Sequence, residues 1–69
     1  MEYFNMKIGA HNISVENIGN GFYKVSLNNS SIGNILKRNG AWIIQAEHPF
    51  SEIELQVIGA EIKNKFINP

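Results

Sequence analysis

Hydrophobic and polar residues alternate through the first two thirds of the chain, and this alternation predicts short β-strands. In the first segment, Phe4, Met6 and Ile8 alternate with polar neighbours, which is the period of a strand with one buried face. The clearest segment runs from residue 22 to residue 28. The pattern predicts strands at residues 3–10, 13–18, 22–28, 31–38 and 41–47.

Turn-forming residues separate these segments. Asn-Gly dipeptides at residues 20–21 and 39–40 supply the positive φ angles of type I′ turns, so each predicts a two-residue hairpin. Asn and Ser residues at 28–30 predict another turn, and His-Asn at 11–12 predicts the first one. Because short turns join neighbouring antiparallel strands, the sequence predicts an antiparallel meander of four to five strands.

The hydrophobic period changes after residue 50 and predicts one helix, over residues 52–66. Ser51 is a favourable N-cap, and Glu54 three residues later completes a capping box. Phe50 and Leu55 form the pair of a hydrophobic staple around this cap. Strands followed by a single helix predict an α+β fold in which the C-terminal helix packs on one face of the sheet.

The predicted helix carries two apolar stripes. The expected core face contains Leu55, Ile58, Ile62 and Phe66. The second stripe lies nearly opposite, and we identify it as a candidate protein-binding surface made of Ile53, Val57, Ala60 and Ile67. A helix that covers a sheet needs only one apolar stripe. The second therefore indicates either a wide core contact or a surface for a partner.

The predicted sheet also carries more apolar surface than one helix covers. Five strands spaced about 4.8 Å apart are roughly 24 Å wide, whereas a helix is about 10–12 Å across. The fourth predicted strand is apolar on both faces, since Ile35 lies opposite Ile32 and Leu36 in simple alternation, and the fifth is also two-sided. Two explanations stay open: a surface for a partner, or a sheet that curls like a barrel.

Trp42 and Gly59 add two expectations about packing. Trp42 on a central strand suits a core, and if it is exposed it would be an energetic centre of binding, so it joins the candidate protein-binding residues. Gly59 lies in the middle of the predicted helix, where glycine costs about 1 kcal/mol relative to alanine. It predicts a close approach between the helix and the sheet or another helix.

The charge balance argues against the electrostatic classes of binding. Six Lys and Arg residues balance six Glu residues, so the net charge is zero and the footprint that dominates nucleic-acid binding is missing. Lys37 and Arg38 nevertheless form a basic pair at a predicted hairpin tip, and Lys24 lies on the neighbouring strand. These three residues carry an alternative hypothesis, that the sheet binds nucleic acid weakly.

The residues that support catalysis or metal binding are scarce. The chain has no cysteine and two histidines, His11 and His48, which is too few for a zinc site without carboxylate ligands. Glu52 and Glu54 are explained by the start of the predicted helix, where negative charge is favourable. We therefore expect no catalytic residues, no metal, no cofactor and no enzymatic activity.

Length and composition indicate a small single domain over residues 1–69. A domain of this size without disulfides has little stability to spare, and self-association is a common remedy, so we expect a homo-oligomer. No apolar run reaches the roughly 20 residues that span a bilayer. The N-terminus does not resemble a secretory signal. We expect a cytoplasmic protein without a membrane partner.

One feature of the composition completes the hypothesis about function. Isoleucine and asparagine are used heavily, which is typical of AT-rich coding and indicates a low-GC bacterium, a phage or another mobile element. Together with the surplus apolar surface, this favours a small non-catalytic protein-interaction module that self-associates and binds another protein to inhibit or adapt it.

Overall fold

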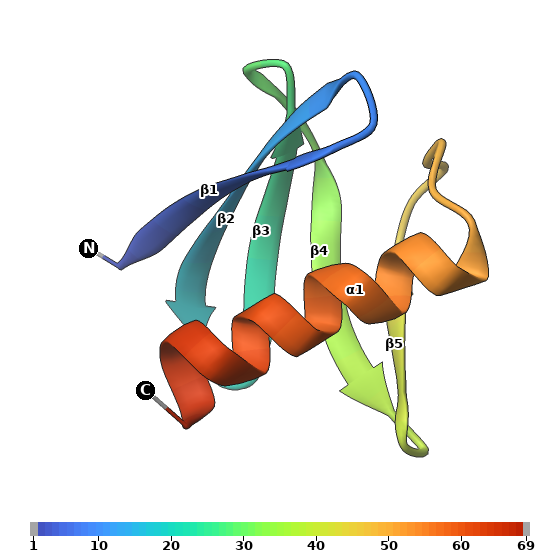
Figure 1. Ribbon diagram of the computed structural model, residues 1–69. Helices are drawn as coiled ribbons and strands as arrows, with labels where there is room; N and C mark the ends of the chain where they lie inside the picture. The colour runs from blue at the N-terminus through green and yellow to red at the C-terminus, as the bar shows by residue number, and fades with distance from the viewer. Residues whose placement is uncertain (1, 69) are drawn as a thin grey trace.

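The computed structural model describes residues 2–68, which form one sheet covered by one helix (Figure 1). Within these residues the elements are β1 (Tyr3–Ile8), β2 (His11–Gly19), β3 (Phe22–Leu27), β4 (Ser30–Arg38), β5 (Ala41–Ile44), α1 (Glu52–Ile62) and η1 (Lys63–Ile67). The strands pair antiparallel in the order β1-β2-β3-β4-β5. The prediction of an α+β fold, with an antiparallel meander followed by one helix, is confirmed.

Two-residue turns connect the strands. The turns at residues 20–21 and 39–40 have positive φ at both positions, 58° and 80° in the first and 53° and 81° in the second, as type I′ geometry requires. Asn28 and Asn29 form a turn without glycine, and their φ angles are also positive, at 49° and 71°. Asparagine tolerates this conformation because its short polar side chain bonds locally. The turn predictions at these three positions are confirmed.

The first hairpin differs from its prediction. The turn lies at Gly9 and Ala10, and His11 pairs with Ile8 as the first residue of β2. Strand β1 therefore ends at residue 8 instead of residue 10. Gly9 has φ of 59°, a conformation that glycine adopts without steric cost, and it outweighs the weaker His-Asn signal that follows. Strand β5 is also shorter than predicted, ending at Ile44 instead of residue 47.

A bulge in β4 changes which side chains reach the core. Val25 pairs with Gly33, but the next residue of β3 pairs with Ser31, so Ile32 is the extra residue. Ile32 consequently packs against the same core as the fully buried Ile35, whereas simple alternation placed the two on opposite faces. Gly33 allows the bulge, since its φ is 153° and an added Cβ would lie 2.8 Å from the Cβ of Ala46.

The helix starts as the sequence predicts. The Ser51 hydroxyl accepts a hydrogen bond from the Glu54 N–H at 3.2 Å, and Glu54 Oε1 accepts one from the Ser51 N–H at 2.8 Å. Phe50 and Leu55 on either side of the cap are both buried in the core. The capping box thus satisfies two backbone donors that the first turn of a helix leaves without partners.

Removing this cap should cost a measurable part of the stability. We expect Ser51→Ala to lower the free energy of unfolding by about 1 kcal/mol, because the Glu54 N–H loses its acceptor. Ser51→Asn, which can keep the cap, should stay within about 0.5 kcal/mol of the wild type. Urea denaturation of the two variants measures the difference, and equal stability of Ser51→Ala and the wild type would contradict a role for the cap.

The helix ends with a wider turn. The N–H of Asn68 donates to the Lys63 carbonyl at 2.6 Å, a bond over five residues, and residues 63–67 form the π-helical turn η1. The predicted helix of residues 52–66 is therefore α-helical only to Ile62. The sequence also predicts that the helix cannot continue past Asn68 and Pro69, and Pro69 lies outside the described residues.

The helix crosses the strands instead of running along them (Figure 1). Its first half contacts β5, and Phe66 near its end lies 5.3 Å from Phe4 on β1 and 5.5 Å from Tyr23 on β3, measured between ring centroids. A helix of 16 residues is about 24 Å long, which matches the width of the sheet. The width of sheet that is covered is therefore set by the length of the helix. The expectation that one helix is too narrow to cover the sheet, which rested on the helix diameter, was wrong.

The extent of the surface agrees with this arrangement. The chain exposes 4442 Å², close to the roughly 4,400 Å² expected of a compact monomer of this mass. Figure 1 shows the sheet curling around the helix, with β1 brought forward on the same side as α1. The length of the helix and the curling of the sheet together account for the apolar inner face. The outer stripe of the helix needs a separate explanation.

Candidate protein-binding surfaces

The outer stripe of the helix lies on the surface of the molecule. Ile53 is 77 % exposed and Val57 is 45 % exposed, and Ala60 between the next turns is exposed as well. The inner stripe is closed, since Leu55, Ile58 and Ile62 are buried and Phe66 packs against the core. The helix thus divides its apolar residues between the core and solvent, and the outer set is available for contact with another molecule.

Ile67 belongs to this stripe less closely than the sequence suggests. It is 51 % exposed, but it lies in η1, where a turn contains more residues than an α-helical turn. Each residue of such a turn advances by a smaller angle around the axis. Ile67 is therefore displaced around the helix from the line through Ile53 and Val57, so the continuous part of the stripe runs from Ile53 to Ala60.

Trp42 does not lie on a binding surface. Its side chain is only 7 % exposed, and it lies on β5, which is an edge strand instead of the central strand expected. The indole ring fills the space opposite Gly59, where an added Cβ would overlap it. The expected close approach at Gly59 is confirmed, and it is an approach of the helix to the sheet. Trp42 is a core residue, so its place among the candidate binding residues was wrong.

A second apolar surface lies on the outer face of the sheet. Leu36 on β4 pairs with Ile43 on β5, and both point away from the helix because their neighbours Ile35 and Trp42 face it. Phe22 on β3 is half-buried on the same outer face, and Ile18 near the adjoining turn is 48 % exposed. The sequence indicates the two-sided character of β4 and β5, whereas Phe22 and Ile18 were missed as contributors.

The three basic residues of the nucleic-acid hypothesis do not form one surface. The Lys37 ammonium lies over the Trp42 ring, 5.9 Å from its centroid, on the helix side of the sheet. Arg38 and Lys24 point to the outer face, where Glu16 is the cross-strand neighbour of Lys24. The fold therefore places Lys37 on a different face from Lys24 and Arg38, so the three cations do not form the single basic surface that a phosphate backbone would contact.

Both histidines pack against Phe50. His11 lies edge-on to this ring at a centroid distance of 6.3 Å, and His48 stacks on it at 5.8 Å. The Nδ1 atom of His48 also accepts the N–H of Phe50 at 3.1 Å. Both histidines thus have a packing role around Phe50, the residue that precedes the N-cap of the helix. Over residues 2–68, no three His, Asp or Glu side chains gather closely enough to hold a metal ion.

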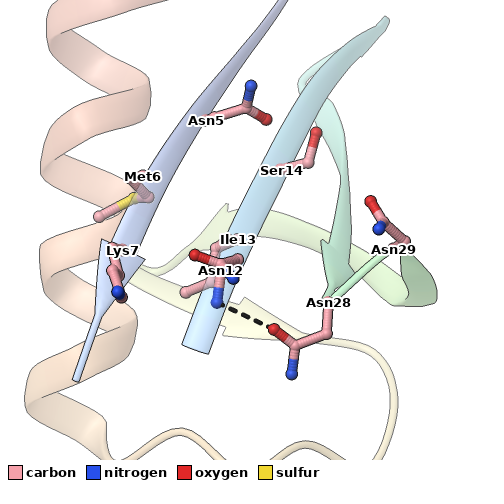
Figure 2. Close-up of a pocket in the computed structure, with 8 residues that line it drawn as sticks. All are labelled: Asn5, Met6, Lys7, Asn12, Ile13, Ser14, Asn28 and Asn29. Carbon is pink, nitrogen blue, oxygen red and sulfur yellow. Dashed lines mark hydrogen bonds between the residues drawn. The ribbon is translucent and has the colours of Figure 1, made fainter. Parts of the chain in front are cut away.

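One open depression lies on the outer face of β1 and β2, with a volume of about 630 Å³ (Figure 2). Figure 2 shows Asn5 on β1, Ser14 on β2 and Asn29 in the turn between β3 and β4 around this space. Asn28 Oδ1 accepts a hydrogen bond from the Asn12 N–H at 3.1 Å at its lower end. The side chains that line it are amides, one hydroxyl, one ammonium and two apolar groups. They supply hydrogen bonds without a paired acid and base.

Within residues 2–68, the chain contains no helix of the length and hydrophobicity needed to cross a membrane. The comparisons with known proteins add no relative: no family model, no curated protein and no solved structure matches this chain.

Proposed function

We propose that this protein is a small non-catalytic interaction module that binds another protein through the outer stripe of its helix. The observation that carries this proposal is the exposure of Ile53, at 77 % of its surface, on a helix whose inner face is completely used by the core. Large apolar side chains that are exposed together on one face favour binding, because each Å² of apolar surface that a partner covers stabilises the complex by about 25 cal/mol.

The size of the stripe limits the kind of partner. From Ile53 to Ala60 it is about 10 Å long and as wide as a helix, so it covers on the order of 100 Å². A standard interface buries about 800 Å² on each partner. Two flat stripes placed face to face would fall well below this value. A groove that surrounds the helix on its flanks reaches a larger area, so the stripe suits insertion into a groove of a different protein.

The partner class follows from the charges as well. The net charge is zero, and Lys37 lies on one face of the sheet while Lys24 and Arg38 lie on the other, so the chain has weak means of holding a polyanion. Lys24 and Arg38 point to the outer face of the sheet, away from the helix stripe. We therefore propose that the partner is a protein and not a nucleic acid. Its binding should depend only weakly on salt concentration. Inhibition or adaptation of that partner is the proposed outcome of binding.

Val57→Glu tests the stripe directly. We expect this variant to lose binding of the partner by at least tenfold, because a charge would be buried in an apolar contact. Its free energy of unfolding should change by no more than about 0.5 kcal/mol, since Val57 is 45 % exposed. Affinity capture from the source cell identifies proteins held by the wild type, and calorimetry with the purified partner measures the loss.

Ala41→Glu is the matched control for that experiment. It also places a glutamate on an exposed apolar residue, but on β5, away from the helix stripe, with Arg38 as its cross-strand neighbour. It should keep the affinity of the wild type. A partner that binds both variants equally well would show that the helix stripe is not the binding surface.

A further inference from the structure

The free edge of β1 offers backbone hydrogen bonds that nothing in residues 2–68 uses. Ile8 pairs with His11 across a two-residue turn, and the Glu2 carbonyl accepts the N–H of Asn17 at 2.9 Å. In an antiparallel ladder, alternate residues bond to the neighbouring strand, so the even-numbered residues of β1 bond to β2. The N–H and C=O groups of Tyr3, Asn5 and Lys7 consequently point away from the sheet.

The opposite edge of the sheet is better protected. Strand β5 has only four residues, and Gln56 of the helix donates its side-chain amide to the Trp42 carbonyl at 3.4 Å. Natural proteins protect sheet edges by shortening the edge strand or covering it, because an open edge is a template for another strand. The fold applies both devices to β5. Strand β1 has six residues and carries one lysine as its only charge, so it is the edge prepared for pairing.

We propose that a second copy of this chain pairs its β1 antiparallel to this edge, with the two Asn5 residues facing each other across a two-fold axis. Outward-facing residues must pair with outward-facing residues in such a ladder. The arrangement with the longest overlap therefore places Tyr3 beside the second copy's Lys7. It forms about six backbone hydrogen bonds and joins the two sheets into one.

The side chains of β1 are self-complementary in this register. On the outer face, the Tyr3 ring, which is 62 % exposed, lies beside an ammonium group, a favourable cation–π pair that occurs twice by symmetry. On the inner face, Phe4 lies beside the second copy's Met6, and both are only half-buried in one copy. No two like charges face each other. The same strand thus satisfies both sides of the contact, which is what a second copy requires.

This inference goes beyond the proposed function: it assigns the self-association expected from the sequence to β1, and it leaves the helix stripe free for the other protein. Phe66 at the end of the helix packs on Phe4 and so holds β1 in place next to the proposed contact. One strand pair is a small interface, so we expect association in roughly the micromolar range, as for other weak and transient contacts. Sedimentation equilibrium over a wide dilution series should show a reversible dimer.

Asn5→Pro is the variant that tests the edge. Proline removes the outward N–H of residue 5 but takes no bond from the β1–β2 ladder, and edge strands tolerate it at such a position. We expect its dimerisation to be at least tenfold weaker than that of the wild type. Asn5→Thr keeps the N–H and should dimerise within threefold of the wild type. Circular dichroism checks that both variants fold.

A disulfide test reads the register without relying on affinity. The chain has no cysteine, so Asn5→Cys places a single thiol at the proposed axis, where facing Cα atoms lie about 5.5 Å apart. Oxidised glutathione should convert this variant to a covalent dimer. Ser14→Cys on β2 is the matched control and should remain monomeric, because two strands of β1 separate the two thiols.

Several outcomes would overturn the inference. A wild type that is monomeric at every concentration contradicts it, as does an Asn5→Pro variant that dimerises like the wild type. Equal cross-linking of Asn5→Cys and Ser14→Cys contradicts the register. If Val57→Glu abolishes dimerisation while Asn5→Pro preserves it, self-association uses the helix stripe instead. Loss of partner binding in Val57→Glu with an intact dimer would separate the two surfaces, so each proposal can fail alone.

Discussion

Gly59→Ala is expected to destabilise the protein by about 2 kcal/mol or more, although alanine favours a helix over glycine by about 1 kcal/mol. The reason is the overlap of the added Cβ with the Trp42 indole, which is 7 % exposed and closely surrounded. A buried ring cannot move aside as the end of a flexible side chain does. The helix must therefore shift away from the sheet, and it loses contacts along the inner stripe.

The sign of this effect separates packing from helix propensity. Urea or thermal unfolding measures it, and 1 kcal/mol corresponds to a change in Tm of about 4–8 °C in a domain of this size. Ala60→Gly on the exposed side reports the propensity term alone and should cost about 1 kcal/mol. In a Trp42→Phe background the cost of Gly59→Ala should fall. A Gly59→Ala variant more stable than the wild type would contradict the close approach.

Ile58→Ala is expected to lower the free energy of unfolding by about 2–5 kcal/mol. Ile58 is 0 % exposed and lies at the centre of the inner stripe, so its truncation leaves a cavity between the helix and the sheet. A chain of this length has a total stability of only about 3–10 kcal/mol. The variant should therefore be partly or wholly unfolded at 37 °C, as circular dichroism at increasing temperature would show.

Ile53→Ala is the matched control, since it makes the same truncation on the outer stripe. Ile53 is 77 % exposed, so we expect a change within about 0.5 kcal/mol. A large loss of stability in this variant that disappears on dilution would mean that a second copy covers the stripe in solution. A large loss at every concentration would contradict the division of the helix into an inner and an outer face.

The elements that could be predicted in detail are those in which the partners lie close in sequence. The capping box joins Ser51 to Glu54, and the Asn-Gly turns depend on the conformations of two adjacent residues. Such preferences act in the chain before any tertiary contact forms. The first hairpin shows the limit, because two local signals compete there. The glycine at residue 9 decides the turn, and β1 ends two residues early.

The sequence pattern identified the apolar residues proposed for binding, but it did not show which of them are exposed. The exposed positions Ile53 and Val57 follow from helix periodicity once the inner stripe is known. The place of Trp42 depends on which face of β5 the helix covers, which periodicity alone leaves open. Lys37 and Arg38 are adjacent in sequence, yet the strand places them on opposite faces, one over the indole ring and one on the outer side.

The amino-acid sequence by itself determined the order of strands and helix, their approximate ends, the two-residue turns and the two-sided character of the helix, because each depends on interactions within a few residues. Only the tertiary structure decided that the helix crosses the sheet, that a bulge turns Ile32 toward the core and that β5 is covered while β1 is open. These features depend on contacts between distant segments, such as Gly59 with Trp42 and Phe66 with Phe4. Such contacts are selected by close packing of the whole core, and no local preference specifies them.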